Sequence, residues 1–394
     1  MSKSEELIKR AERVIMPTYA RFPIAFESGN GCVLKDVNGK EYLDCVAGIA
    51  VDCLGHNHPD LNAAIADQCQ KIMHVSNLYW TGPQIDAAEM LVKASGLDKV
   101  FFCNSGAEAN EAALKLARIY AKQFKSEDAV EIIAMDHSFH GRTYGAITAT
   151  GQEKYHKGLD PMLPGISHVP FNDFDALKAA VTDKTCAVLL EPIQGEGGIY
   201  PADYEYLQAV RKLCDDENLV LIFDEVQCGM GRSGKFFAYQ HYNLKPDVVC
   251  MAKGIAGGFP MGGIIACDKV AQVFTPGTHA STFGGNPLAS AASRYVLSVL
   301  TGDGFLDEVA EKGSYLMEKL RVLKKEHTCI TDVRGMGLMV GVAVSVPTGE
   351  IINKAMEKGL LLVGAGSDAI RFVPPLIINK EEIDKAVEIF GECL

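Results

Sequence analysis

Two short apolar segments, each followed by a charged residue, constrain the fold of this chain most strongly. The segment 219–223 (LVLIF) is closed by Asp224, and the segment 247–252 (DVVCMA) is closed by Lys253. Continuous apolar runs of this length, rich in β-branched residues, are typical of parallel strands that are buried on both faces. Ligands of open α/β sheets bind beyond the carboxyl ends of the strands, so we expect Asp224 and Lys253 to face the same crevice.

A carboxylate and an amine at one crevice permit two interpretations. A lysine can form a Schiff base with the aldehyde of pyridoxal phosphate, while an acid keeps the pyridine nitrogen of this cofactor protonated. The alternative is a buried ion pair between Asp224 and Lys253 without any chemistry. These two residues taken alone support both interpretations equally.

Length and charge narrow the class of protein. A chain of 394 residues is too long for one hydrophobic core, so we expect two domains. The net charge of -12 disfavours nucleic acids and anionic membrane surfaces as partners. No apolar segment is long enough to span a bilayer, and the first residues lack the apolar stretch of a secretory signal. The twelve cysteines form no C-x-x-C pair, which argues against a structural zinc site of that type, and a reducing cytoplasm is the simplest setting for them.

A third expected strand, residues 100–103, leads into a segment suited to binding an anion. Ser105 and Glu108 have the spacing of a capping box, and a helix with one apolar face follows. Gly106 has no side chain at the point where the free N–H groups of a helix start point outward, which makes an anion site. An ordinary capped helix is the alternative. The anion site gains support because this strand should end beside Asp224 and Lys253.

Two further strands end in polar loops with candidate site residues. After residues 132–135, Phe139 or His140 could lie flat on an aromatic cofactor, and Arg142 could bind a carboxylate as a planar fork. The alternative is a packed loop with a solvated arginine. After residues 187–190, Glu196 lies in a glycine-rich loop, where it is either a mobile site group or merely exposed.

Two histidines close together, His56 and His58, raise the question of a metal. Two histidines in one loop without a third ligand are more often structural, so we predict no metal site.

The two ends of the chain differ in pattern from its middle. The expected elements are an amphipathic helix over 4–15, a hairpin over 33–43 turning at Asn38-Gly39, an antiparallel strand over 262–267, strands near 337–344 and 360–363 between two helices, and a last helix from about Lys380. We therefore predict an α/β fold. A large domain, residues 50–297, carries a mostly parallel central sheet, and a small α/β domain combines both termini, residues 1–49 and 298–394.

Six motifs in order carry a resemblance to a known family. They are 104–110 (NSGAEAN), 139–142 (FHGR), 191–198 (EPIQGEGG), 224–229 (DEVQCG), Lys253-Gly254 and 281–287 (STFGGNP). Together they resemble the class III pyridoxal-phosphate aminotransferases, and the segment 47–51 (AGIAV) is most similar to the acetylornithine branch of this family. One departure is 255–258 (IAGG), where relatives usually carry more glycine. The resemblance spans essentially the whole chain and implies the type I fold of pyridoxal-phosphate-dependent transferases.

The resemblance implies roles for the residues around the cofactor. Lys253 would form the Schiff base and later move a proton between Cα and C4′ of the cofactor. Asp224 would pair with the pyridinium nitrogen and keep the ring an electron sink. Gln227 would touch the phenolic oxygen, and Phe139 would stack on the ring.

The same resemblance implies how the phosphate is held. Ser105, Gly106 and Ala107 would form the phosphate loop, the last two through their backbone N–H groups. Thr282 matches a residue that reaches a phosphate in the neighbouring subunit. The resemblance thus implies a homodimer with shared active sites.

Substrate residues and the reaction follow from the resemblance as well. Arg371 would bind the α-carboxylate of the substrate, and Arg142 and Ser281 would hold the acetylornithine end. We further hypothesise that Glu196 pairs with Arg371 while a terminal amine reacts. Glutamate or 2-oxoglutarate then displaces Glu196 and binds Arg371 itself.

The implied reaction moves the terminal amino group of N-acetylornithine to 2-oxoglutarate, giving N-acetylglutamate 5-semialdehyde and glutamate, in arginine biosynthesis. Ornithine, succinylornithine, succinyldiaminopimelate and 4-aminobutyrate are alternative donors, because a few pocket side chains set this choice. An aminomutase and a cofactor-binding protein without turnover are the alternatives from other classes.

Overall fold

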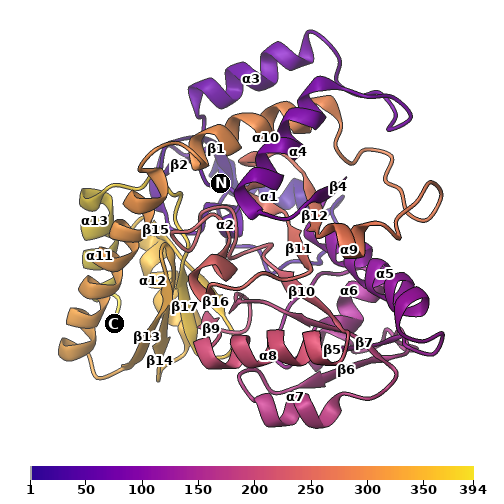
Figure 1. Cartoon of the computed structure of the whole chain (residues 1–394). Coiled ribbons are helices and arrows are strands. Elements are labelled where there is room, and N and C mark those ends of the chain that lie inside the picture. The colour runs from indigo at the N-terminus through magenta and orange to yellow at the C-terminus, as the bar shows by residue number, and fades with distance from the viewer. Residues whose placement is uncertain (1) are drawn as a thin grey trace.

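The centre of the computed structural model, which describes residues 2–394, is a seven-stranded sheet of order β4-β12-β11-β10-β7-β5-β6 (Figure 1). Its strands are β4 (Lys99–Cys103), β5 (Glu131–Met135), β6 (Ile166–Val169), β7 (Thr185–Leu190), β10 (Val220–Asp224), β11 (Val248–Met251) and β12 (Gly262–Ala266). Only β12 runs antiparallel to its neighbours. The carboxyl ends of the other six strands therefore meet at one edge, and the expected antiparallel strand over 262–267 is confirmed.

Both faces of this sheet are apolar because helices cover each of them. In β10, Leu221 and Phe223 belong to one hydrophobic core, and Val220 and Ile222 belong to the other. The helix α5 (Gly106–Phe124) packs on the second face. The first face is covered by α4 (Gly82–Ser95), α8 (Tyr204–Asp216) and α10 (Pro287–Leu300). Burial on both faces explains why the strand sequences are apolar without alternation.

Shorter elements surround the central sheet. The short helices are α2 (Ala47–Ala50), α3 (Pro59–Cys69), α6 (Tyr144–Ala149), α7 (Phe174–Ala180), α9 (Asp268–Ala271) and the 3-10 turns η1 (Glu153–Tyr155), η2 (Ala238–Tyr242) and η3 (Lys253–Ala256). A small hairpin pairs β8 (Ile193–Gln194) with β9 (Tyr200–Pro201). The loop of this hairpin contains Glu196.

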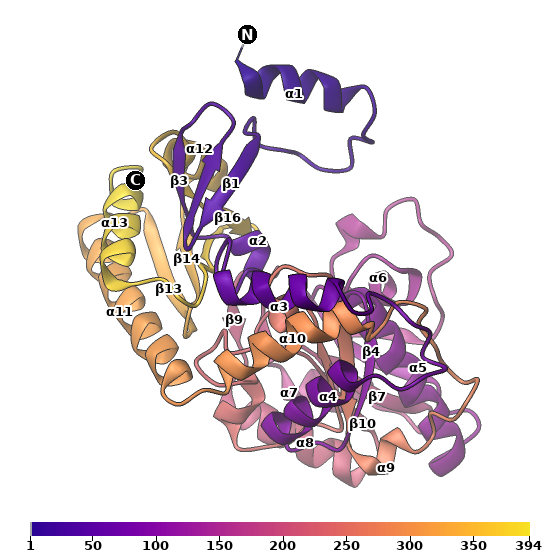
Figure 2. The same ribbon diagram turned by 90° about the horizontal axis from the view of Figure 1, so that it is seen from above.

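Residues from both ends of the chain share one of the smaller sheets. Its order is β1 (Phe26–Asn30), β2 (Val33–Asp36), β3 (Glu41–Asp44) and β15 (Leu360–Leu361), with β3 parallel to β15. A second, antiparallel sheet has the order β13 (Ile330–Met336), β14 (Met339–Val344), β17 (Ala369–Phe372) and β16 (Val363–Ala365). The helices α11 (Phe305–Glu326), α12 (Thr348–Glu357) and α13 (Lys380–Gly391) accompany these sheets (Figure 2). The domain boundaries after residues 49 and 297 remain predictions.

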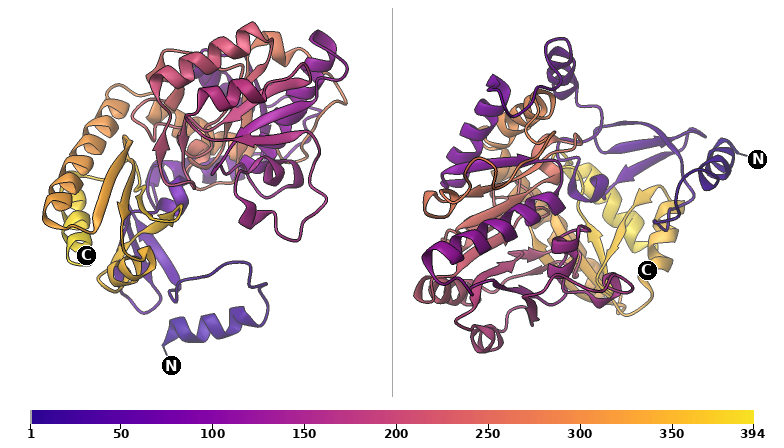
Figure 3. Two further views of the ribbon diagram at one scale, coloured as in Figure 1. Left: turned by 90° about the horizontal axis from the view of Figure 1, so that it is seen from below. Right: turned by 90° about the vertical axis from the view of Figure 1, so that its right-hand side faces the viewer.

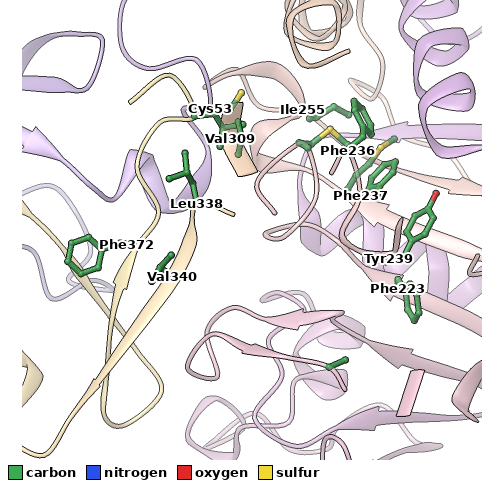
Figure 4. Close-up of a cluster of buried hydrophobic side chains, with 14 of the residues drawn as sticks. Cys53, Phe223, Phe236, Phe237, Tyr239, Ile255, Val309, Leu338, Val340 and Phe372 are labelled. Atoms are coloured by element: carbon green, nitrogen blue, oxygen red, sulfur yellow. The ribbon is translucent and has the colours of Figure 1, made fainter. Parts of the chain in front are cut away.

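One hydrophobic core connects the central sheet with the C-terminal elements. Figure 4 shows part of it, with Phe223, Phe236, Phe237 and Tyr239 from the large sheet side and Val309, Leu338, Val340 and Phe372 from the C-terminal side. This shared core holds the C-terminal sheet, and with it Arg371 on β17, against the edge where the parallel strands end.

The N-terminal helix α1 (Lys3–Glu12) projects from the rest of the chain (Figures 2 and 3). The sequence predicted a helix to residue 15, but the helix ends three residues earlier, and Val14, Met16 and Tyr19 are exposed. The predicted hairpin turn is present, since the Gly39 N–H donates to the Asp36 oxygen over 3.0 Å. Within residues 2–394, none of the helices combines the length and apolar character needed to cross a bilayer.

Candidate active site

A cavity of about 350 Å³ lies at the edge where the parallel strands end. Asp224 is the last residue of β10, and its neighbour in β11 is Cys250, three residues before Lys253. The predicted site residues that line the cavity are Ser105, Gly106, Ala107, Phe139, Asp224, Gln227 and Lys253. The structure thus brings the acid and the amine to one crevice, together with the segment at the start of α5.

Asp224 is buried and held by three hydrogen-bond donors. Its Oδ2 atom lies 2.7 Å from His140 Nδ1 and 2.8 Å from Asn110 Nδ2, and its Oδ1 atom accepts from the Val226 N–H over 3.0 Å. Sequence reasoning missed Asn110. A signal was available, because Asn110 interrupts the apolar face of α5 one turn before Ala113. Phe139 and His140 both line the cavity, and the His140 side chain also contacts the acid.

The start of α5 has the features of an anion site. Gly106 and Ala107 are the first two helical residues, and no hydrogen bond to their N–H groups is found within residues 2–394. A Cβ atom on Gly106 would lie 2.7 Å from Val226 Cγ1, so the turn requires glycine. The predicted capping box is only half correct. Ser105 Oγ accepts from the Glu108 N–H over 3.2 Å, but the Glu108 carboxylate accepts from the N–H of Asn104.

Lys253 starts the turn η3 in a backbone conformation that is unusual for a residue with a side chain. Its φ angle is 46°, in the left-handed region, which concentrates at functional sites. Burial lowers the pKa of Lys253 from its usual value, and the positive charge of Arg371 adds to this, while Glu196 opposes it. No salt bridge or hydrogen bond of its Nζ atom is found among residues 2–394.

Glu196, Arg371 and Gln227 form a connected polar group beside the cavity. Arg371 Nη1 lies 2.5 Å from Glu196 Oε1 and 2.8 Å from Gln227 Oε1, and Nη2 lies 3.3 Å from Glu196 Oε2. The Arg371 side chain is 1 % exposed and the Glu196 side chain 23 %. Burial alone would raise the pKa of Glu196, but the attraction of Arg371 outweighs it, and the pKa lies below its usual value. The pair hypothesised from the sequence is therefore present.

The glycine-rich loop around Glu196 is packed rather than loose. A Cβ atom would lie 2.5 Å from Gln227 Cδ at Gly195 and 2.6 Å from the His137 oxygen at Gly197. The main chain is also tied down, since Gly366 N donates to the Glu196 oxygen over 2.8 Å. Close packing therefore requires glycine at these positions.

Five predicted residues do not line the cavity: Glu196 and Arg371, which lie beside it, and Arg142, Ser281 and Thr282. Arg142 is exposed, and its guanidinium carbon lies 4.1 Å from the centre of the Tyr155 ring. Ser281 Oγ accepts from Asn104 Nδ2 over 3.2 Å, and Asn104 lines the cavity. Thr282 is exposed. One chain thus brings none of these five side chains onto the wall itself.

Both histidines of the loop before α3 have structural partners. His56 Nε2 lies 2.8 Å from Asp44 Oδ2, and His58 caps α3 by accepting from the Leu61 N–H. Within residues 2–394, no group of three or more His, Cys, Asp or Glu side chains is arranged to hold a metal ion.

Two buried acids next to the site residues were not singled out from the sequence. Glu191 follows β7 and lines the cavity, and Glu225 follows Asp224. Burial raises the pKa of each carboxyl group to about 7. The signal that could have identified Glu191 is an acid placed directly after a continuous apolar strand, and Glu225 is the second acid after such a strand.

Comparison with known proteins places this site in a family. A family model described as aminotransferase class-III matches residues 14–394. The chain belongs to the class III aminotransferase family. It is 52% identical to an acetylornithine aminotransferase of Caldanaerobacter subterraneus, covering 98% of this chain and 99% of that protein.

Two solved structures of this family superpose on the whole aminotransferase. The N-acetylornithine aminotransferase of Stenotrophomonas maltophilia has a TM-score of 0.85 at 37% identity, covering 98% of each chain. The ornithine aminotransferase of Toxoplasma gondii, with pyridoxal phosphate in partial occupancy, has a TM-score of 0.94 at 31% identity, covering 99% of this chain and 94% of that chain. The fold is therefore the type I fold that the resemblance implied, and the enzyme is a pyridoxal-phosphate-dependent transaminase.

The cavity of the aminotransferase suits pyridoxal phosphate. The free N–H groups of Gly106 and Ala107 match a phosphate, and the fixed carboxylate of Asp224 matches a protonated ring nitrogen. Lys253 offers an uncommitted amine for the aldehyde. The cavity volume, about 350 Å³, is in the range of small-molecule sites.

Proposed function

We propose that this aminotransferase moves the terminal amino group of N-acetylornithine to 2-oxoglutarate, giving N-acetylglutamate 5-semialdehyde and glutamate, as a step of arginine biosynthesis. The observation that carries the proposal is the buried Arg371, paired with the partly exposed and therefore displaceable Glu196. The full-length similarity to an acetylornithine aminotransferase supports the choice of donor.

Two unlike donors have to use this site in turn. The terminal amine of acetylornithine arrives on a carbon without a carboxylate, so a free Arg371 would be an unpaired buried charge. Glu196 neutralises it at this stage. Glutamate or 2-oxoglutarate carries an α-carboxylate, which fits the planar fork of Arg371 and displaces Glu196. The Glu196 side chain is 23% exposed, so it can move toward solvent when a substrate carboxylate binds Arg371.

The residues of this chain would divide the work of catalysis between them. Bound pyridoxal phosphate supplies an aldehyde that takes up amino groups and a ring that withdraws electrons. Asp224, fixed by Asn110 and His140, would hold the proton at the ring nitrogen. Lys253, with its lowered pKa, would take the proton from the amine-bearing carbon of the substrate and deliver it to C4′ of the cofactor. Phe139 would cover the ring, and Gln227 would link its phenolic oxygen to Arg371.

We further propose a homodimer with shared active sites. The loop between α3 and α4 and the loop before α10 form an exposed apolar surface, made of Ile72, Met73, Leu78, Tyr79, Trp80 and Phe283. Asn77 Nδ2 ties these loops together by donating to the oxygens of Ser281 and Gly284 over 3.1 and 2.8 Å. A single chain rarely exposes such a patch without a partner. Thr282 is exposed and directly precedes Phe283, which supports its predicted contact with the phosphate of the other subunit.

A cytoplasmic location fits the chemistry of the cysteines. All twelve are free thiols, and most of them are buried as small apolar side chains.

Ornithine is the second candidate donor, because an ornithine aminotransferase superposes with a TM-score of 0.94. Succinylornithine, succinyldiaminopimelate and 4-aminobutyrate are further candidate donors. An aminomutase would turn over without any added oxo acid. A strict dependence of turnover on 2-oxoglutarate would therefore contradict this alternative.

The deciding experiment is a donor panel. Holoenzyme is assayed with each of these amines and 2-oxoglutarate, and kcat/KM is compared. The proposal predicts the highest value for N-acetylornithine. A higher kcat/KM for another donor would contradict it.

A further inference from the structure

Glu191 has a position between two segments that both reach the cofactor cavity. It directly follows β7, its side chain is buried, and it forms part of the cavity wall. Its Oε1 atom accepts from the Phe139 N–H over 2.9 Å, and its Oε2 atom accepts from the Gly195 N–H over 2.9 Å. One carboxylate therefore holds the segment that follows β5 and the loop of the β8–β9 hairpin.

Each of the two segments carries a group of the site. Phe139 faces the cavity, and the next residue, His140, contacts Asp224. Gly195 precedes Glu196, which pairs with Arg371. A shift of the segment after β5 would disturb the contact of His140 with Asp224. A shift of the hairpin loop would disturb the contact of Glu196 with Arg371.

We propose that Glu191 is a positioning residue that fixes these two segments relative to each other. Glu196 is thereby held in contact with Arg371, and Phe139 is held in the cavity wall. Only a carboxylate presents two acceptor oxygens toward two N–H donors at once. An amide in its place accepts one N–H and turns its own donor group toward the other. This inference rests on the proposed function, because it concerns the balance of the two half-reactions.

Glu225 provides a matched comparison within the same protein. It is also buried, and it accepts from the N–H groups of Ala238 and Tyr239 over 2.6 and 2.7 Å. Burial is the main cause that raises the pKa of Glu191 and of Glu225, in each case to about 7. The partners of Glu225 belong to the start of η2, and its side chain is not part of the cavity wall. The two acids therefore differ mainly in the segments that they bind: two segments at the cavity for Glu191, and the start of η2 for Glu225.

The test compares the holoenzyme variants Glu191→Gln and Glu225→Gln. Single-turnover rates are measured for the terminal amine donor and for glutamate, and hydrogen exchange is followed by mass spectrometry over residues 137–141 and 193–199. In Glu191→Gln, the amine half-reaction should fall about tenfold more than the glutamate half-reaction, as expected for losing one buried hydrogen bond. Exchange should become faster in at least one of the two segments. In Glu225→Gln, both half-reactions should change by the same factor, and exchange in these segments should stay as in the wild type.

Several results would overturn the inference. These are equal losses in both half-reactions of Glu191→Gln, unchanged exchange in both segments, or the same split in Glu225→Gln. If Glu191→Gln does not fold, Glu191→Asp serves instead, because its carboxylate keeps the charge but is one methylene too short to reach both donors. A wild-type enzyme that rejects N-acetylornithine contradicts the proposed function alone, because the exchange measurement and the preferred amine still test the role of Glu191.

Discussion

Replacing Glu196 by alanine tests the proposed change of partner at Arg371. The substitution removes two contacts of the guanidinium, at 2.5 and 3.3 Å, and leaves those to Gln227 at 2.8 Å and to the Gly364 oxygen at 3.3 Å. Breaking a buried pair by removing one partner costs about 3–5 kcal/mol. Because the Glu196 side chain is 23% exposed, water can replace part of it. We therefore expect a loss of about 2 kcal/mol in the free energy of unfolding.

The kinetic effect of Glu196→Ala should depend on the substrate. An unpaired Arg371 no longer suits a terminal amine, so this half-reaction should slow by about 10- to 100-fold, corresponding to about 1.4–2.8 kcal/mol. Glutamate brings its own carboxylate to Arg371, so its half-reaction should change by less than about threefold. Stopped-flow absorbance of the bound cofactor follows both half-reactions separately.

A control variant is available at the opposite end of β11. Asp247 pairs with the partly buried Arg211 over 3.0 Å, but it precedes the strand, whereas the cavity lies beyond the other end. Asp247→Ala should therefore lower stability and leave the ratio of the half-reactions unchanged. If Glu196→Ala slows both half-reactions by the same factor, Glu196 does not act as a switch.

Three further predictions follow from other parts of the chain. Gly197→Ala places a Cβ atom 2.6 Å from the His137 oxygen, so urea unfolding should show a loss of about 1–3 kcal/mol, whereas Gly349→Ala, with open space around it, should show none. Trp80 is the single tryptophan and 89% exposed, so Trp80→Arg should turn a dimer into a monomer in sedimentation, and a monomeric wild type would refute the proposed interface. Glu225 has a folded-state pKa of about 7 against the usual 4.5, so it retains a proton that the unfolded chain releases, and stability should fall as pH rises through this interval. The melting temperature of Glu225→Gln should depend less on pH over the same interval, and an equal slope would contradict the assignment.

The sequence predicted the position of Asp224 and Lys253 because this depends on a local pattern. An apolar run without alternation identifies a strand buried on both faces, and the residue that follows it lies at the carboxyl edge. The same reasoning located the start of α5. The pair of Glu196 and Arg371 joins residues 175 positions apart, and no local pattern links them, so it came from the resemblance and the expected chemistry.

Other features were beyond local reasoning for physical reasons. A glycine-rich loop is compatible with mobility and with close packing, and only the neighbours of Gly195 and Gly197 show that packing applies. The early end of α1 has a similar cause, since the apolar residues after it contact no core of their own chain. Glu191 was missed as a bridge because one of its two partners, Phe139, lies 52 positions away in another loop, and no local pattern links them.

The position of the cofactor on Lys253 is the claim on which the remaining account depends. The holoenzyme is reduced with borohydride, which fixes the cofactor to the lysine that carries it, and the labelled peptide is identified by mass spectrometry. We expect the pyridoxyl group on Lys253 and no labelled lysine in Lys253→Ala. A label on any other lysine of the wild-type enzyme would contradict it.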